Sequence, residues 1–123
     1  MKGFFRFLSK NKKIHRPWGY YKSLSQTDDY QIKEIVVYPG KRLSLQSHEQ
    51  RSEVWTVIKG EAVVQVLEEE LIKKEQESVY IPKQTKHRLW NKSNTNLVIV
   101  EVQMGSYFGE DDIVRYEDDF GRI

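Results

Sequence analysis

Short runs of β-branched and aromatic residues, each ended by a turn signal, occupy most of this 123-residue chain. The run from Tyr30 to Tyr38 alternates, with Gln31, Lys33, Ile35 and Val37 on one side, and Pro39-Gly40 then predicts a turn. Lys59-Gly60 separates two further runs and predicts a tight hairpin. No stretch has a convincing helical period. We therefore expect an all-β sandwich or barrel, with strands over residues 18–24, 30–38, 42–46, 53–58, 61–67, 71–74, 77–81, 87–91 and 97–103.

Charge and cysteine content narrow the class of protein. The net charge is only +2, which gives no strong field for nucleic acid or a membrane, so neither is an expected partner. The chain has no cysteine, which excludes disulfides and thiolate catalysis. Arg6 interrupts the short apolar start, and no small-residue cleavage site follows, so we expect no secretory signal and a cytoplasmic protein. Residues 1–15 are expected to form a basic arm and residues 16–123 a single domain.

Four residues with metal-ligating side chains lie near the ends of predicted strands: Gln46, His48, Glu53 and His87. Gln46 and His48 are two residues apart, so on a strand they share a face. Glu53 opens the next strand, where antiparallel pairing can bring it beside them. Two imidazoles, a carboxylate and an amide oxygen suit a divalent ion such as zinc, manganese, iron, cobalt or nickel. On spacing alone, a metal site and histidines satisfied by ordinary hydrogen bonds are equally good interpretations. His15 lies in the basic start and is expected to be structural or exposed.

The same residues resemble a known family. The order Gly40, Gln46, His48, Glu53 and Gly60 resembles the first cupin motif, and Pro82, His87 and Asn91 resemble the second. More specifically, the chain is similar to the cupin domain of type II phosphomannose isomerases, which is often fused to a mannose-1-phosphate guanylyltransferase. The matching stretches are Arg16-Pro-Trp-Gly-Tyr, Pro39-Gly-Lys-Arg-Leu-Ser-Leu-Gln-Ser-His48, Arg51-Ser-Glu53-Val-Trp55, Tyr80-Ile-Pro82, His87-Arg88, Gly109-Glu-Asp-Asp-Ile-Val-Arg115 and Gly121-Arg122. The resemblance implies a cupin fold, a double-stranded β-helix of the jelly-roll type.

The resemblance also implies an activity. It implies a mannose-6-phosphate isomerase of GDP-mannose biosynthesis, with a divalent metal held by Gln46, His48, Glu53 and His87. Proton transfer between C1 and C2 through a cis-enediol needs a base, and an electrophile that the metal would supply. Arg115, in the Glu-Asp-Asp-Ile-Val-Arg stretch, is implied as a catalytic arginine. The base stays open between Lys41, Glu110 and a metal-bound water.

The substrate is expected to be a small-molecule sugar phosphate. The arginine fork suits a phosphate dianion, and the predicted substrate-binding residues are Arg42, Arg51 and Arg88, with Lys41 as a further candidate. Family members often carry aromatic or histidine residues where this chain has Glu49 and Gln50, and Gln84 stands where glycine is usual. These departures are expected to change the shape of the pocket.

Two other functions compete with this hypothesis. One is a non-catalytic cupin that binds a sugar or nucleotide sugar, or that supports a separate guanylyltransferase. The other is a cupin isomerase or epimerase that acts on a different substrate. No glycine-rich nucleotide signature occurs, so guanylyl transfer is not expected of this chain. A homodimer is expected, because exposed sheet edges favour being covered, with residues 1–16 as the candidate arm.

Overall fold

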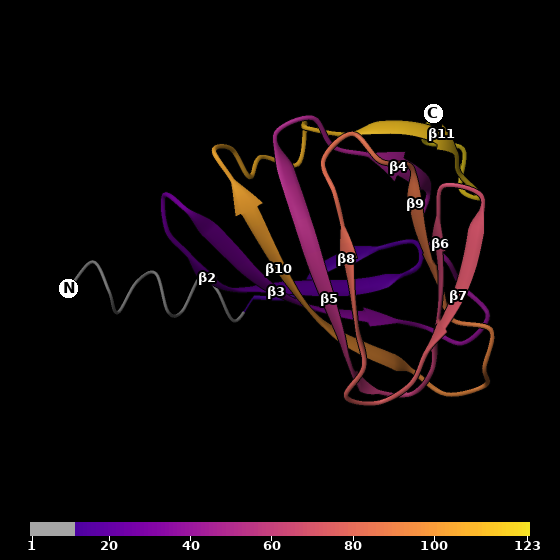
Figure 1. Cartoon of the computed structure of the whole chain (residues 1–123). Helices are drawn as coiled ribbons and strands as arrows, with labels where there is room; N and C mark the ends of the chain where they lie inside the picture. Colours follow the sequence, from indigo (N-terminus) through magenta and orange to yellow (C-terminus); the bar gives the residue numbers. More distant parts are fainter. Residues whose placement is uncertain (1–11) are drawn as a thin grey trace.

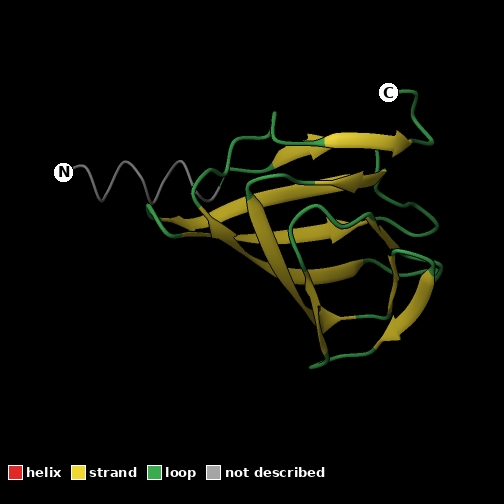
Figure 2. Ribbon diagram, turned by 45° about the horizontal axis from the view of Figure 1, so that its top comes forward, coloured by secondary structure: helices red, strands yellow, loops and turns green. Residues whose placement is uncertain are grey.

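Two antiparallel sheets face each other in the computed structural model, which describes residues 12–123 (Figure 1). The six-stranded sheet has the order β1-β2-β3-β10-β5-β8, and the five-stranded sheet has the order β11-β4-β9-β6-β7. Their bounds are β1 Ile14–Arg16, β2 Gly19–Gln26, β3 Tyr30–Val37, β4 Leu45–Ser47, β5 Arg51–Lys59, β6 Ala62–Val66, β7 Glu69–Lys73, β8 Ser78–Ile81, β9 His87–Trp90, β10 Leu97–Gly105 and β11 Val114–Glu117. Across residues 12–123 there is no helix, and so none able to span a membrane (Figure 2). The all-β prediction is confirmed.

The predicted strands correspond to β2 through β10, with ends displaced by a few residues. Two short strands were not predicted. β1 adds to the edge of β2, and β11 lies in the acidic tail and pairs with β4. The tail therefore forms part of the barrel wall. Residues 1–11, most of the predicted basic arm, lie outside the described residues.

The tight hairpin predicted at Lys59-Gly60 is wrong. β5 pairs with β10 and β8 in one sheet, whereas β6 pairs with β7 and β9 in the other, so the chain changes sheets between them. Gly60 has a φ of +95°, and a Cβ there would lie 3.3 Å from the Asn96 carbonyl oxygen. Glycine adopts this left-handed conformation without steric cost. A lysine-glycine pair therefore signals a sharp bend, but it does not tell which strands the bend will pair.

The inward faces of β3 and β10 are apolar at one end and polar at the other. Paired positions match in character: Ile35 with Ile99, Val37 with Leu97, Lys33 with Glu101 and Gln31 with Gln103. β5 continues the division on the other side of β10, where Val57 pairs with Ile99 and Glu53 pairs with Gln103. Because side chains alternate along a strand, one register fixes both halves of this division.

The apolar halves of both sheets form one core. Its buried members are Trp18, Ile35, Val37, Leu43, Trp55, Val57, Ala62, Val64, Ile81, Leu89, Leu97 and Ile99. Fully burying a large aliphatic or aromatic side chain stabilises the fold by about 1.5–3 kcal/mol, so this half of the barrel supplies most of the favourable packing. The buried polar residues of the other half lie outside this core and can form a binding site.

Candidate metal centre

Three side chains bring ligand atoms together at the polar end of the barrel. The ligand atoms of His48, Glu53 and His87 all lie within 4.8 Å of one another, and all three residues are buried. His48 Nε2 is 3.4 Å from Glu53 Oε2, and His87 Nε2 is 3.6 Å from Glu53 Oε1. Gln46 on β4 pairs directly with His87 on β9. Glu53 comes from β5 in the opposite sheet, so it faces the histidines across the barrel and does not pair beside them as predicted.

The two imidazoles are oriented by backbone carbonyls. His48 Nδ1 lies 2.7 Å from the Asp112 carbonyl oxygen, and His87 Nδ1 lies 2.8 Å from the Thr85 carbonyl oxygen. A carbonyl only accepts a hydrogen bond, so each Nδ1 carries the proton and each Nε2 presents a lone pair toward Glu53. Burial lowers the pKa of His48, which favours the neutral, ligating form.

The donor set fits a divalent ion. His87 Nε2 is buried and has no hydrogen-bond partner among residues 12–123, which is costly for a polar atom unless something else binds there. Two neutral imidazoles and a carboxylate are a set that transition metals and zinc accept.

Gln46 can complete this set by turning its amide. As placed, its Oε1 accepts a hydrogen bond from Ser44 Oγ at 2.7 Å, while its Nε2 lies 3.5 Å from His48 Nε2. Amide oxygen and nitrogen have nearly the same shape, and a rotation of 180° exchanges them. In the rotated amide Nε2 can donate to the serine hydroxyl, and Oε1 faces the lone pair of His48 Nε2, so that both atoms are available as ligands to one cation.

Glu53 and Glu101 are two buried carboxyls with opposite pKa shifts. Trp55 Nε1 donates to Glu53 Oε1 at 3.1 Å and to Glu101 Oε2 at 2.9 Å. Burial raises the pKa of Glu53, but His87, His48 and Arg51 outweigh burial, and the pKa falls to about 2. Burial and the nearby Glu53 raise the pKa of Glu101 to about 8. Glu53 is therefore ionised at neutral pH, and Glu101 holds a proton.

Arg51 lies against the ligands. Its Nε donates to Glu53 Oε2 at 3.0 Å, and its Nη2 lies 3.4 Å from His48 Nε2. Its Nη1 donates to the Gly109 carbonyl oxygen at 3.4 Å, which ties it to the tail. This buried guanidinium connects the ligand cluster to the loop before β11.

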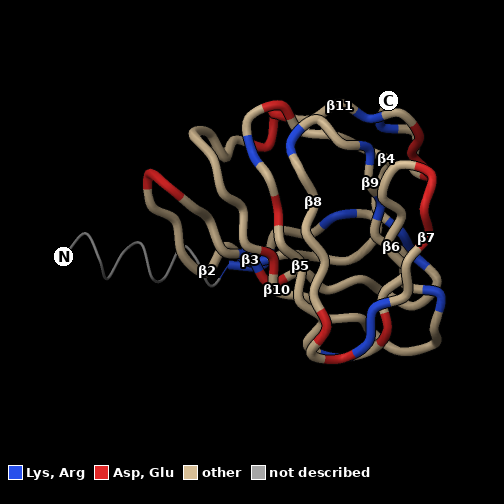
Figure 3. Tube along the Cα trace, in the orientation of Figure 1, with Lys and Arg blue, Asp and Glu red and all other residues tan. Residues whose placement is uncertain are grey.

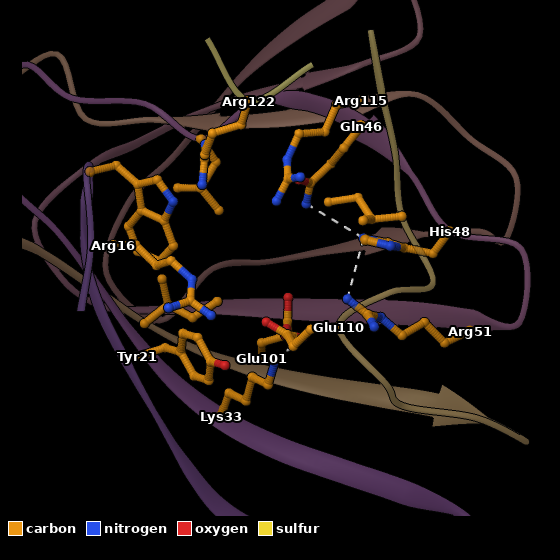
Figure 4. Close-up of a pocket in the computed structure, with 14 residues that line it drawn as sticks. Arg16, Tyr21, Lys33, Gln46, His48, Arg51, Glu101, Glu110, Arg115 and Arg122 are labelled. Carbon is orange, nitrogen blue, oxygen red and sulfur yellow. Dashed lines mark hydrogen bonds and ion pairs between the residues drawn. The ribbon is translucent and has the colours of Figure 1, made fainter. Parts of the chain in front are cut away.

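A cavity of about 100 Å³ borders the ligand cluster (Figure 4). Figure 4 shows Gln46, His48 and Arg115 on one side of it and Tyr21 and Lys33 on the other. The lining residues are rich in cations: Arg16, Lys33, Arg51, Arg115 and Arg122, beside Trp18, Tyr21, Ile35, Leu43, Gln46, His48, Glu101, Glu110 and Ile113. The Nε atom of Arg115 is buried and finds no hydrogen-bond partner within the described part of the chain. Such a lining is suited to an anionic, polyhydroxylated ligand.

Glu110 lines this cavity, and an ion pair holds its carboxylate. Lys33 Nζ lies 2.8 Å from Glu110 Oε2 and 4.3 Å from the centre of the Tyr21 ring. Burial raises the pKa of Glu110, but the Lys33 ammonium outweighs burial and the pKa falls below its usual value. The Glu110 side chain is still 48% exposed, so it can reach a ligand. Burial, followed by the charge of Glu110, raises the pKa of Tyr21 to about 12.

Three predicted residues lie away from the cavity. Arg42 is held by Asp119 through bonds of 2.7 and 2.8 Å. Arg88 is buried and donates to the Leu43 carbonyl oxygen at 2.9 Å. Lys41 is exposed in the turn after Tyr38, and none of the three lines the cavity. Of the predicted substrate-binding residues, only Arg51 does.

Sequence reasoning missed five polar or charged residues of the cavity wall: Arg16, Tyr21, Lys33, Glu101 and Arg122. A signal existed for two of them. Lys33 shares the alternating face of Ile35 and Val37, and Glu101 interrupts the most apolar strand. A charge on an otherwise apolar face costs free energy unless it serves a site or is paired. The other three come from elements whose position only the fold reveals.

Two of the residues that depart from the family pattern, Gln84 and Glu49, contact each other. Gln84, which stands where glycine is usual, has a φ of +60°. Its backbone N–H donates to the His48 carbonyl oxygen at 2.7 Å, and its Nε2 donates to Glu49 Oε2 at 3.0 Å. Gln84 therefore keeps the left-handed turn that glycine would take, and it links that turn to the segment that carries His48.

Known proteins resemble this chain in sequence and in fold. Residues 6–118 match the protein family described as "Mannose-6-phosphate isomerase C-terminal". The chain belongs to this family. Over 112 residues, 91% of the chain, it is 49% identical to "Xanthan biosynthesis protein XanB" of Xanthomonas campestris pv. campestris, of which it covers 24%. It is 48% identical over 89% of its length to "Alginate biosynthesis protein AlgA" of Pseudomonas aeruginosa, of which it covers 23%. It is 43% identical over 92% of its length to "Mannose-1-phosphate guanylyltransferase ManC" of Salmonella typhimurium, of which it covers 24%.

Members of this family thus occur within longer biosynthetic proteins, and the chain spans about a quarter of the curated relatives it matches. Solved structures share the fold. The capsular polysaccharide assembling protein CapF of Staphylococcus aureus superposes with a TM-score of 0.75 at 20% identity, over 86% of this chain and 32% of that one. A double-stranded β-helix protein of Klebsiella pneumoniae superposes with a TM-score of 0.70 at 19% identity, over 89% of each chain. The cupin prediction is confirmed.

Proposed function

We propose that this chain is a metal-dependent isomerase that interconverts mannose 6-phosphate and fructose 6-phosphate. The observation that carries the proposal is a buried His-Glu-His donor cluster beside a cavity lined by cations. The family and its mannose-related name agree with this substrate class. A cytoplasmic location stays a prediction.

Gln46, His48, Glu53 and His87 would hold the metal, through the rotated amide oxygen, two Nε2 atoms and the carboxylate. When bound, the metal supplies Lewis-acid stabilisation for the negative charge that develops on a sugar oxygen during enolisation. The carbonyls of Asp112 and Thr85 keep both imidazoles in the ligating tautomer. Trp55 keeps the Glu53 carboxylate in place through its indole N–H.

Glu110 is the base we propose for the proton transfer between C1 and C2. It is a cavity carboxylate, its ion pair with Lys33 keeps it ionised, and it retains exposure toward a ligand. Lys41, the other side chain considered as a base, does not line the cavity. Glu110 would take the proton from one carbon and return it to the other. A positioned general base of this kind contributes roughly 10²–10⁴-fold to a rate.

Arg115 and Arg16 are the phosphate contacts we propose. The buried Nε of Arg115 has no hydrogen-bond partner among the residues that the structure describes, and both side chains line the cavity. Arg122 is already held by Asp118 through bonds of 2.7 and 2.9 Å, so it suits a fixed wall more than a mobile clamp. A lysine ammonium is a point charge and is less selective for phosphate than the arginine guanidinium, so Arg115 and Arg16 are better candidates than Lys33.

A second function has one observation in its favour. The chain spans about a quarter of relatives that include a mannose-1-phosphate guanylyltransferase, so it could bind a sugar or nucleotide sugar in support of such a partner. A cupin of different sugar specificity is a variant of the same idea. Both alternatives predict ligand binding without turnover of mannose 6-phosphate.

The test uses the purified chain loaded with divalent metal and an assay that couples fructose 6-phosphate formation to NADPH production. We expect turnover in the wild type and its loss in His48→Ala and His87→Ala. His15→Ala is the matched control, because His15 is exposed on β1 and should leave turnover unchanged. Stoichiometric metal in both ligand variants would refute the site, and binding without turnover in the wild type would favour the second function.

A further inference from the structure

β7 presents a free strand edge whose charges are segregated along its length. It is the last strand of the five-stranded sheet, at the rim of the barrel (Figure 1). The segment from residue 68 to 74 reads Glu-Glu-Glu-Leu-Ile-Lys-Lys, so one end is acidic and the other basic (Figure 3). Edge strands with unpaired N–H and C=O groups are templates for pairing with another strand.

The register of β6 and β7 fixes which residues face outward. Val66 pairs with Glu69 across a two-residue turn, and Val64 pairs with Leu71. In such a hairpin, alternate residues bond inward, so Glu69, Leu71 and Lys73 direct their backbone groups to β6. Glu70 and Ile72 direct theirs away from the sheet. Among residues 12–123 these outward groups have no other backbone partner.

We propose that this edge pairs with the same edge of a second copy of the chain, antiparallel about a two-fold axis at Leu71. In that register Glu70 of one copy lies opposite Ile72 of the other, and their outward N–H and C=O groups bond across the axis. The same register sets Glu69 against Lys73 and Glu68 against Lys74, and the symmetry repeats each pair. The two five-stranded sheets become one continuous sheet.

The charged side chains at the two ends of β7 are available to pair with a second copy. Glu68, Glu69, Lys73 and Lys74 have no ion-pair partner within the described part of the chain, whereas Glu70 already pairs with Lys92 at 3.2 Å. Parallel pairing would place like charges together, and antiparallel pairing places opposite charges together. The pattern therefore selects one orientation, and a two-fold contact of this kind closes after two copies.

Apolar surface beside the edge supports the same partner. Leu67, Ile72 and Tyr80 are 59%, 59% and 57% exposed, and Leu71, Val79 and Tyr80 line an open groove between β7 and β8. Directly opposed residues of a non-hydrogen-bonded pair lie about 4.5–5.5 Å apart at Cβ, so Leu71 would meet its own copy over this groove. None of these residues lines the candidate active-site cavity, so pairing would leave that cavity open.

Two opposite charge reversals and their mixture test the proposal, with mass measured by light scattering after gel filtration and by sedimentation. We expect a dimer in the wild type. Lys73→Glu with Lys74→Glu makes the edge uniformly acidic, and Glu68→Lys with Glu69→Lys makes it more basic. Each should raise the dissociation constant of the dimer by about a hundredfold or more, because attraction becomes repulsion. An equimolar mixture of the two variants should dimerise again, which misfolded proteins could not do.

Lys12→Glu with Lys13→Glu is the matched control, since it changes the net charge by the same amount at exposed positions just before β1, which lies in the other sheet. This control should remain dimeric. A monomeric wild type would overturn the proposal, as would a dimer that tolerates both reversals, or variants that fail to recover a dimer when mixed.

Discussion

Asp112 couples the acidic tail to the candidate metal ligand His48, and removing its carboxyl should loosen that ligand. Its Oδ1 and Oδ2 accept hydrogen bonds from the backbone N–H groups of Glu49 and Gln50, each at 3.0 Å. Its own carbonyl oxygen accepts from His48 Nδ1 at 2.7 Å. The carboxylate thus pins the loop whose carbonyl orients the imidazole. Asp112→Ala leaves the carbonyl in the chain but releases the loop that holds it in place.

The size of the effect follows from these bonds. A hydrogen bond to a charged group contributes about 1.5–3 kcal/mol, and part of the loss is recovered when water reaches the freed N–H groups. We therefore expect Asp112→Ala to lower the free energy of unfolding by about 2–4 kcal/mol. Loss of a group that orients a metal ligand typically weakens metal binding by about 10–100-fold, and we expect an effect in that range.

The assay is calorimetric titration of zinc into the metal-free protein, at a temperature where both proteins remain folded. Asp111→Ala is the matched control, because Asp111 is exposed and contacts Tyr107 but no part of the ligand cluster. The control should bind zinc as the wild type does. Equal zinc affinity in Asp112→Ala and wild type would refute the idea that the tail orients His48.

Three further predictions follow from single contacts. Burial and the nearby Glu53 raise the pKa of Glu101 to about 8 from an ordinary value of 4.5, so between these pH values the folded metal-free protein keeps a proton that the unfolded chain releases, and the free energy of unfolding falls as pH rises. Glu101→Gln should flatten this pH dependence in thermal unfolding, and an unchanged slope would contradict the raised pKa. A Cβ on Gly19 would lie 2.0 Å from the Val36 carbonyl oxygen, so Gly19→Ala should lower the free energy of unfolding by about 2–3 kcal/mol or more. An unchanged midpoint of urea unfolding would show that β2 can shift to accommodate the methyl group at no cost. Arg115→Lys keeps the positive charge but loses the two-pronged guanidinium, so the KM for mannose 6-phosphate should rise about tenfold with a smaller change in kcat. An unchanged KM would show that Arg115 does not bind the phosphate.

The sequence was most informative where a local pattern has one structural meaning. Alternation in residues 30–38 placed Gln31, Lys33, Ile35 and Val37 on one side of the strand, and the structure shows that this side faces inward. The two-residue spacing of Gln46 and His48 predicted their common side. Turn signals located most strand ends within a few residues. The resemblance then selected the cupin among all-β folds, which alternation alone could not do.

The sequence was least informative where strand pairing and side-chain position depend on how distant parts of the chain come together. Lys59-Gly60 bends the chain in the same way whether the next strand pairs locally or enters the other sheet. Arg42 and Arg88 lie close to the ligands in sequence, yet Asp119 and the Leu43 carbonyl hold them away from the cavity. Arg16 and Arg122 are distant in sequence, and both line the cavity because β1 and the segment after β11 come together there.

We propose above that this barrel isomerises a sugar phosphate at the His48–Glu53–His87 cluster. The most direct test follows mannose 6-phosphate by proton NMR in deuterated water, with metal-loaded protein and with the same protein after chelation. We expect fructose 6-phosphate to appear only with the metal-loaded protein, together with deuterium at the carbon that exchanges its proton. Bound mannose 6-phosphate that stays unchanged over prolonged incubation with metal-loaded protein would contradict it.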